Sequence, residues 1–212
     1  MTQRNSDRDL VDGPGGEASA GIDPRVWLRS AHIFSTAIRG VLENKLLREV
    51  SPCPLTPSQF HLLKLMSLDG RHHVGEVADL LGVSAPAATK NIDKLEGLGL
   101  VVRTRSSGDR RATLLSVSPE GRRLVEDYER LMTVRLSPVL GRFEAEEIAR
   151  FRDLLERFAV SLLEHEPPEE DYCLLCAAYL EADCPVGRVR GGCPYQKLQA
   201  AAAGRQAPDA AG

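Results

Sequence analysis

The feature that most constrains the fold is an eight-residue segment, 77–84 (VADLLGVS). It covers the end of a short helical pattern, Val74 to Leu81, and the turn that leads into a second helical pattern. Two helices that meet at a steep angle need a small residue where they approach each other, and Ala78 provides one. The tight turn needs a residue that can reach positive φ, and Gly82 lies four positions further on. We expect Ser84 to cap the second helix. The apolar residues expected to hold the two helices together are Val77, Leu81 and Val83. This pattern predicts a helix-turn-helix.

The residues after the segment predict a two-stranded hairpin. The second helix should run from Ala85 to about Leu98, where Gly99 ends it. Residues 100–105 read as a strand, 106–111 as a polar turn and 112–117 as the returning strand. A hairpin in this place is the wing of a winged helix-turn-helix. In that arrangement the second helix enters the major groove of duplex DNA.

Further helical patterns flank this unit. One runs from Pro24, after an Asp23 cap, to about Val50, and a second runs from Pro57 to about Leu68. After the hairpin, helices are expected from Pro119 and from about Glu144 to Leu163. The helices expected from Pro24, from Pro119 and from about Glu144 have long apolar stripes, and these stripes need a partner surface to pack against. The fold class expected is mainly α with a small β-hairpin wing, with terminal helices that form a homodimer.

Charge is unevenly distributed along the chain. The formal net charge is −3, but residues 84–123 contain eight Lys or Arg and four Asp or Glu. Residues 164–183 contain seven acidic residues and no Lys or Arg. Because DNA responds to the local field, the basic segment that includes the hairpin is compatible with binding to phosphates.

The segment from about Trp27 to Leu163 resembles the multiple antibiotic resistance regulator (MarR) family. The most specific match is the wing, DRRATLLSVSPEG at residues 109–121, where the family pattern is Asp-x-Arg, five positions, Leu-Thr and a later Gly. Here Val117-Ser118 replaces Leu-Thr. The recognition helix also departs from the pattern, with Pro86, an alanine run and Asn91. The resemblance implies a transcription regulator that binds a pseudo-palindromic operator. Because members of the family are usually repressors, it also implies a repressor.

The resemblance also implies which residues contact DNA. Ser84, Thr89 and Lys90 should face DNA, and Arg111 should reach the backbone or minor groove, with Asp109 orienting it. Small apolar residues on the helix are expected against thymine methyl groups. The complete set of expected DNA-binding residues is Ser84, Ala85, Pro86, Ala87, Thr89, Lys90, Arg103, Arg105, Asp109, Arg110 and Arg111.

Four cysteines near the C-terminus, Cys173, Cys176, Cys184 and Cys193, have the spacing C-x2-C-x7-C-x8-C. This pattern predicts a metal or redox site. Two cysteines followed by Pro, with glycines nearby, favour an iron–sulfur cluster as cofactor. Zinc and metal-free redox thiols remain as alternatives.

Other residues leave alternatives open. Cys53, between two prolines, is a sensor thiol or, more in keeping with the burial of cysteine, a packing residue. His72 and His73 are expected at the surface rather than at a metal. The family binds small aromatic acids between the dimer helices and the winged helix, which makes Trp27, His32 and His61 candidates for lining a pocket.

The expected organisation has six parts: a disordered arm (1–22), an N-terminal dimerisation helix (23–54), the winged helix-turn-helix (55–118), C-terminal dimerisation helices (119–166), the cysteine-rich segment (167–197) and a disordered tail (198–212). With no apolar segment long enough for a signal peptide or a bilayer, we expect a cytoplasmic protein without a membrane partner. An enzyme is not expected, because Cys-x-x-Cys lacks the βαβ setting of thiol oxidoreductases. The alternative function is a thiol-redox or zinc-tailed interaction protein whose winged helix makes protein contacts.

Overall fold

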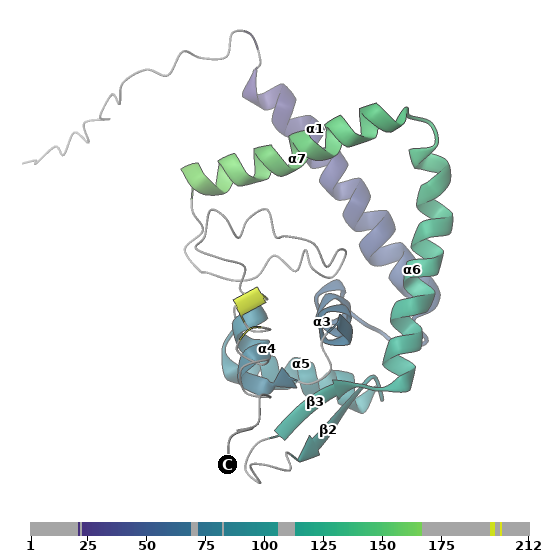
Figure 1. Cartoon of the computed structure of the whole chain (residues 1–212), viewed down its shortest axis with the longest axis vertical. Helices are drawn as coiled ribbons and strands as arrows, with labels where there is room; N and C mark the ends of the chain where they lie inside the picture. The colour runs from purple at the N-terminus through teal and green to yellow at the C-terminus, as the bar shows by residue number, and fades with distance from the viewer. Residues whose placement is uncertain are drawn as a thin grey trace, which may run out of the picture.

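The computed structural model describes residues 21, 23–68, 72–81, 83–105, 113–166, 196–197 and 200. The helical and strand elements in chain order are α1 (Pro24–Ile38), η1 (Arg39–Leu46), α2 (Leu47–Val50), α3 (Pro57–Leu68), β1 (His72–His73), α4 (Val74–Leu81), α5 (Ala85–Gly97), β2 (Val101–Arg105), β3 (Thr113–Val117), α6 (Pro119–Leu140) and α7 (Ala145–His165). At one end of the molecule α3, α4 and α5 pack with the sheet (Figure 1). From there α6 leads to the other end, where α1 and α7 cross. The fold is mainly helical with a small antiparallel sheet, as predicted.

The N-terminal helical segment starts and stops where local chemistry dictates. The Asp23 side chain accepts a hydrogen bond from the backbone N–H of Arg25 at 2.8 Å, and Pro24 occupies the first turn. The segment continues to Val50 as expected, but residues 39–46 are π-helical rather than α-helical. An unbroken 3.6-residue stripe does not signal this wider section. Within it, the Asn44 amide donates to the carbonyl of Arg39 at 2.7 Å.

The sheet has the strand order β1-β3-β2, and both pairings are antiparallel. In the hairpin, Val101 pairs with Val117 and Arg105 pairs with Thr113. The strand β1 was not predicted, because two residues carry no periodic signal. It places His72 opposite Leu115, and His72 is buried. The expectation that His72 lies at the surface is therefore wrong.

One core joins the winged helix to the helices around it. Phe60, Leu62, Leu63 and Met66 of α3 are buried in this core, and Leu65 of the same helix is also buried. Leu46 and Leu47 bring the end of the N-terminal segment into this core. The remaining buried apolar members of the cluster are Val77, Ala78, Ala88, Ile92, Leu95, Leu100, Val101, Leu115, Val117, Leu124, Val125 and Tyr128.

The start of α6 is held against the loop that follows α5. The Ser118 side chain accepts from the Gly121 N–H at 3.0 Å and donates to the carbonyl of Gly99 at 2.6 Å. Gly99 has φ of +70°, a left-handed conformation that glycine adopts more readily than other residues do. A side chain at Gly121 would meet the carbonyl oxygen of Leu100, so the helix can approach the loop only with glycine there.

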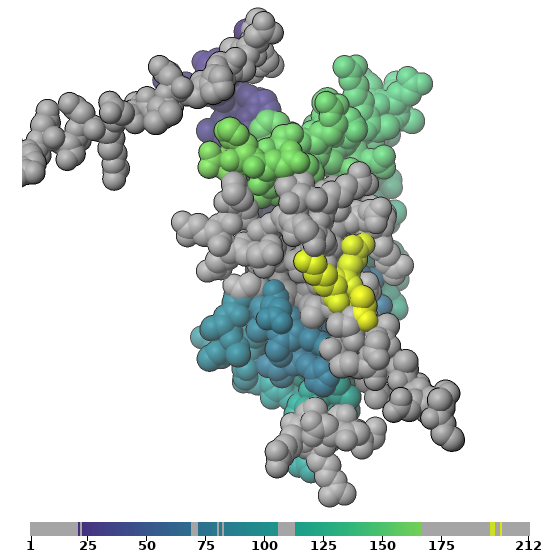
Figure 2. All heavy atoms as spheres, turned by 60° about the vertical axis from the view of Figure 1, so that its left-hand side comes forward, coloured from purple at the N-terminus to yellow at the C-terminus, as the bar shows by residue number. Residues whose placement is uncertain are grey.

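At the other end of the molecule, α1 and α7 contact each other through aromatic rings. Trp27 stacks on Phe158 with ring centroids 4.1 Å apart, and Phe34 meets Phe151 edge-on at 5.4 Å. No residue of α1 or α7 is buried. Figure 2 shows the two helices together at this end, beyond the winged helix. Their apolar stripes are thus largely exposed in a single chain.

Candidate nucleic-acid interface

The turn between α4 and α5 has the geometry of a helix-turn-helix. Val77 and Ala78 are buried, and the Val83 N–H donates to the carbonyl of Ala78 at 3.2 Å. Leu81 is partly buried against the core, as predicted. Val83 is 38% exposed, so the expectation that it helps to hold the two helices together is wrong. Gly82 lies outside the described residues. The small Ala78 is therefore at the helix junction, as predicted.

Ser84 occupies the N-cap position of α5 but makes no capping hydrogen bond with its side chain. Ser84 therefore caps α5 by its position, as predicted, but not through its side chain. A capping oxygen accepts from the N–H of the second or third helical residue. Pro86 is the second residue of α5 and has no N–H, so only the N–H of Ala87 remains as a usual donor to the Ser84 side chain. The exposed Ser84 hydroxyl is left at the open end of the helix.

The helix α5 has a buried face and an outer face. Ala88, Ile92 and Leu95 are buried at spacings of four and three residues. Asn91, on the side of the helix toward α3, accepts from the Gln59 amide at 3.3 Å. The predicted DNA-facing residues of α5 and its cap that lie exposed are Ser84, Ala85, Pro86 and Lys90, while Ala87 and Thr89 are partly buried.

The hydroxyl of Thr89 is occupied within the helix, because it donates to the carbonyl of Ala85 at 2.8 Å. A hydroxyl bonded in this way still has a lone pair that can accept. Lys90 and Lys94 are exposed and form no ion pair with another residue in the described ranges. The outer face of α5 therefore presents two cationic side chains.

The strand β2 carries two arginines, and one of them contacts α5. The guanidinium of Arg103 contacts Asp93 at 2.5 Å and Glu96 at 3.1 Å, both on α5. Arg105 is exposed at the end of the strand. The pairing of the two carboxylates could be predicted from the sequence, because Asp93 and Glu96 are about one helical turn apart. Which arginine contacts them could not be predicted, because that depends on how β2 packs against α5. The predicted wing-tip residues Asp109, Arg110 and Arg111 lie outside the described residues.

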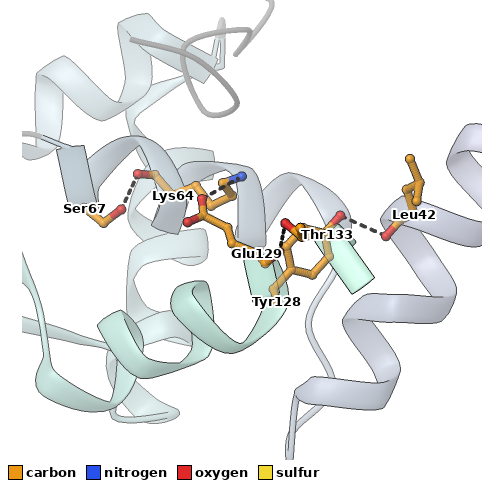
Figure 3. A network of polar contacts seen from close by, with 6 residues as sticks. All are labelled: Leu42, Lys64, Ser67, Tyr128, Glu129 and Thr133. Carbon is orange, nitrogen blue, oxygen red and sulfur yellow. Dashed lines mark hydrogen bonds and ion pairs between the residues drawn. The ribbon is translucent and has the colours of Figure 1, made fainter. Parts of the chain in front are cut away.

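A polar network links the winged helix to α6 and η1 (Figure 3). Lys64 of α3 is only 2% exposed and pairs with Glu129 of α6 at 3.2 Å. Next to Glu129, the Tyr128 hydroxyl donates to the carbonyl of Leu42 in η1 at 2.9 Å. Burial lowers the pKa of Lys64, while Glu129 raises it. Burial also raises the pKa of Tyr128 to about 12, with a contribution from Glu43.

The three residues expected to line an effector pocket are not together in one chain. His61 is half-buried on α3, and burial lowers its pKa while nearby Glu43 raises it. Glu43 acts on His61 and therefore marks its neighbourhood. Trp27 lies sixteen residues before Glu43, which is about 24 Å along a helix, and it stacks on Phe158 instead. His32 is exposed on α1. The pocket is therefore not assembled from these side chains within a single chain.

The predicted cysteine site cannot be located, because Cys173, Cys176, Cys184 and Cys193 lie outside the described residues. Among the residues that are described, no group of three or more His, Cys, Asp or Glu could hold a metal ion. Cys53 is half-buried against the core, and Ser51 donates to its carbonyl at 2.6 Å. None of the described helices is long and apolar enough to cross a membrane.

Comparison with known proteins matches this geometry to one family. A sequence profile of the MarR family matches residues 54–112. The HTH-type transcriptional regulator FarR from Neisseria gonorrhoeae is 30% identical over 108 residues, which are 50% of this chain and 72% of FarR. The HTH-type transcriptional regulator MhqR from Bacillus subtilis is 22% identical over 129 residues, 61% of this chain and 88% of MhqR.

Among solved structures, Streptococcus pneumoniae FabT in complex with DNA has a TM-score of 0.56 and 19% identity, covering 66% of this chain and 99% of FabT. A MarR family protein from Bacillus stearothermophilus has a TM-score of 0.53 and 24% identity, covering 67% of this chain and 99% of that protein. The helix-turn-helix, the hairpin and the matching folds define a winged-helix protein. The chain belongs to the MarR family.

Proposed function

We propose that this protein is a transcription regulator that binds duplex DNA by placing the N-terminal half of α5 in the major groove. The observation that carries the proposal is the outer face of α5, on which Ser84, Ala85, Pro86 and Lys90 are exposed beside the basic strand β2. The 13 residues of α5 span about 20 Å, and a major groove about 12 Å wide admits one helix. The names of the relatives, FarR and MhqR, support the regulatory function.

The proposal includes a homodimer. The argument is the exposed apolar surface of α1 and α7, where Phe34, Phe151, Leu154 and Phe158 are each at least 39% exposed in the single chain. A contiguous apolar surface of this kind on a soluble protein indicates an interface. Pairing α1 and α7 with those of a second copy would bury it. A two-fold dimer presents two α5 helices and requires two related half-sites on DNA.

Control of DNA binding belongs to the same proposal. We propose that the regulator acts as a repressor and that a small aromatic compound binds between the dimer helices and the winged helix. The network through Lys64, Glu129 and Tyr128 supports a connection between these two parts, because it joins α3 to α6 and η1. A compound that alters this network would change the spacing of the two α5 helices.

A second means of control rests on the sequence alone. We propose that Cys173, Cys176, Cys184 and Cys193 bind an iron–sulfur cluster, with zinc or free thiols as the competing possibilities. The test is the iron, sulfide and zinc content per chain of protein purified without oxygen, together with its visible spectrum. Matching iron and sulfide support the cluster, one zinc per chain supports a structural zinc site, and the absence of all three contradicts both metals.

The proposed DNA binding is tested by selecting bound duplexes from a random-sequence pool and sequencing them. We expect enrichment of an inverted repeat whose half-sites lie about one helical turn apart, or a multiple of that, bound by two chains. A protein that enriches no sequence and retains no DNA would contradict the proposal. That result would favour the alternative of a winged helix used for protein contacts.

A further inference from the structure

Arg103 connects the wing to the helix proposed to enter the groove. It lies on β2, and its two terminal nitrogens contact the two carboxylates of α5, at 2.5 Å from Asp93 and 3.1 Å from Glu96. Residues three apart on a helix share one side of it, so the two carboxylates form a pair. The planar guanidinium can bond to both at once. The side chain of Arg103 is only 30% exposed in this position.

The charges of α5 indicate what this contact does. Between Ala85 and Gly97 the helix has two cations, Lys90 and Lys94, and two anions, Asp93 and Glu96, so its formal charge is zero. A surface that binds DNA gains affinity from cations and loses it from anions close to phosphates. Arg103 holds both anions, while the two lysines form no ion pair with any described residue. When Arg103 is bound to Asp93 and Glu96, the negative charges of these two residues no longer offset the positive charges of Lys90 and Lys94.

We propose that Arg103 is a positioning residue for DNA binding, which neutralises Asp93 and Glu96 and fixes α5 against β2 without itself contacting a phosphate. This rests on the proposed function and gives Arg103 a different task from the direct contact that the sequence predicts. Arg105 provides the comparison. It is two residues further along β2, on the same face of the strand, and it forms no ion pair with the described residues.

The test compares the loss of Arg103 in two backgrounds. The probe is the duplex that the wild-type protein selects from a random pool, with sheared mixed-sequence duplex as a second probe. In the wild-type background, Arg103→Ala should weaken binding by about tenfold, because two carboxylates become uncompensated. In the Asp93→Asn, Glu96→Gln background, the same change should weaken binding by less than about twofold. Arg105→Ala should cost the same factor in both backgrounds.

Direct contact between Arg103 and a phosphate gives a different result. Arg103→Ala would then cost the same factor in both backgrounds and would lower the salt dependence of binding by an amount equal to about one neutralised phosphate per chain. That outcome overturns the inference and leaves the proposed function standing. A wild-type protein that binds neither probe overturns both. Thermal unfolding checks each variant's fold, and Arg103→Lys, which keeps the charge but not the double contact, should bind with intermediate affinity.

Discussion

Tyr128 joins three parts of the molecule with one side chain. Its ring packs against Phe60 of α3 with centroids 4.5 Å apart, and its hydroxyl donates to the carbonyl of Leu42 in the π-helical segment. The ammonium of Lys64 lies 5.6 Å from the centre of the same ring. A tyrosine therefore supplies apolar contact and a donor at the point where α3, η1 and α6 meet.

Replacing Tyr128 with Phe keeps the ring contacts and removes only the hydrogen bond to Leu42. We expect the free energy of unfolding at neutral pH to fall by about 1 kcal/mol. The pKa of Tyr128 is about 12 in the folded protein against an ordinary value of 10.0, so the unfolded chain loses its proton first as pH rises. Wild-type stability should therefore fall additionally above pH 10, and the variant should lack this component. Urea unfolding at several pH values measures both effects; equal stability of the two proteins at neutral pH would contradict the first.

For His61 we expect an effect on stability at acidic rather than alkaline pH. Burial lowers its pKa below the ordinary value of 6.5, so on acidification the unfolded chain takes up the proton before the folded chain does. Stability from this residue is present above pH 6.5 and is lost as pH falls below it. We expect His61→Gln to show a shallower loss of stability with acidification than wild type, measured by urea unfolding. His32→Gln, at an exposed site on α1, should follow the wild-type curve.

At the scale of the elements, backbone geometry holds the start of α6 close to the loop after α5. A Cβ at Gly121 would lie 2.3 Å from the carbonyl oxygen of Leu100 and 2.8 Å from a methyl of Val117. Since the contacted oxygen belongs to backbone, it cannot rotate away. Gly121→Ala should lower the free energy of unfolding by about 3 kcal/mol. Gly97→Ala is the matched control, because a Cβ there meets no atom within 4 Å, and it should leave stability unchanged or raise it by up to about 1 kcal/mol.

Element bounds that follow from local chemistry were predictable. Pro24, Pro57 and Pro119 begin helices as expected, and α4 has the predicted bounds Val74–Leu81. The features that were missed depend on residues distant in sequence. The strand β1 exists because His72 pairs with Leu115. The π-helical section at 39–46 depends on a change of hydrogen bonding that the apolar pattern of the sequence does not signal.

The candidate site was predictable to a similar degree. The outer face of α5 follows from its helical period, and Lys90 is exposed as expected. The bonds that occupy Thr89 and Arg103 were not foreseen. Thr89 bonds to its own helix, and Arg103 reaches carboxylates ten and seven residues earlier in the chain. Sequence spacing shows which residues share a face, but the partner across a tertiary contact requires the fold.

At the scale of the whole molecule, we expect formation of the homodimer to depend on the exposed apolar face of α7. Leu154 is 49% exposed, so Leu154→Glu should leave the single chain folded while placing a charge in the proposed interface. We expect the variant to sediment as a monomer at concentrations where wild type is a dimer. Ala149→Glu adds the same charge on the opposite side of α7 and should remain dimeric. A monomeric wild-type protein, or a dimeric Leu154→Glu variant, would contradict this interface.

The claim that α5 binds DNA is tested most directly by the salt dependence of duplex binding. For the wild-type protein we expect log affinity to fall linearly with log salt concentration. Lys90→Ala should bind more weakly and with a slope smaller by about 0.9 for each phosphate that Lys90 neutralises. Arg150→Ala removes one exposed cation from α7, at the opposite end of the molecule (Figure 1), and should match wild type. Binding that is independent of salt, or unchanged by Lys90→Ala, would contradict the claim.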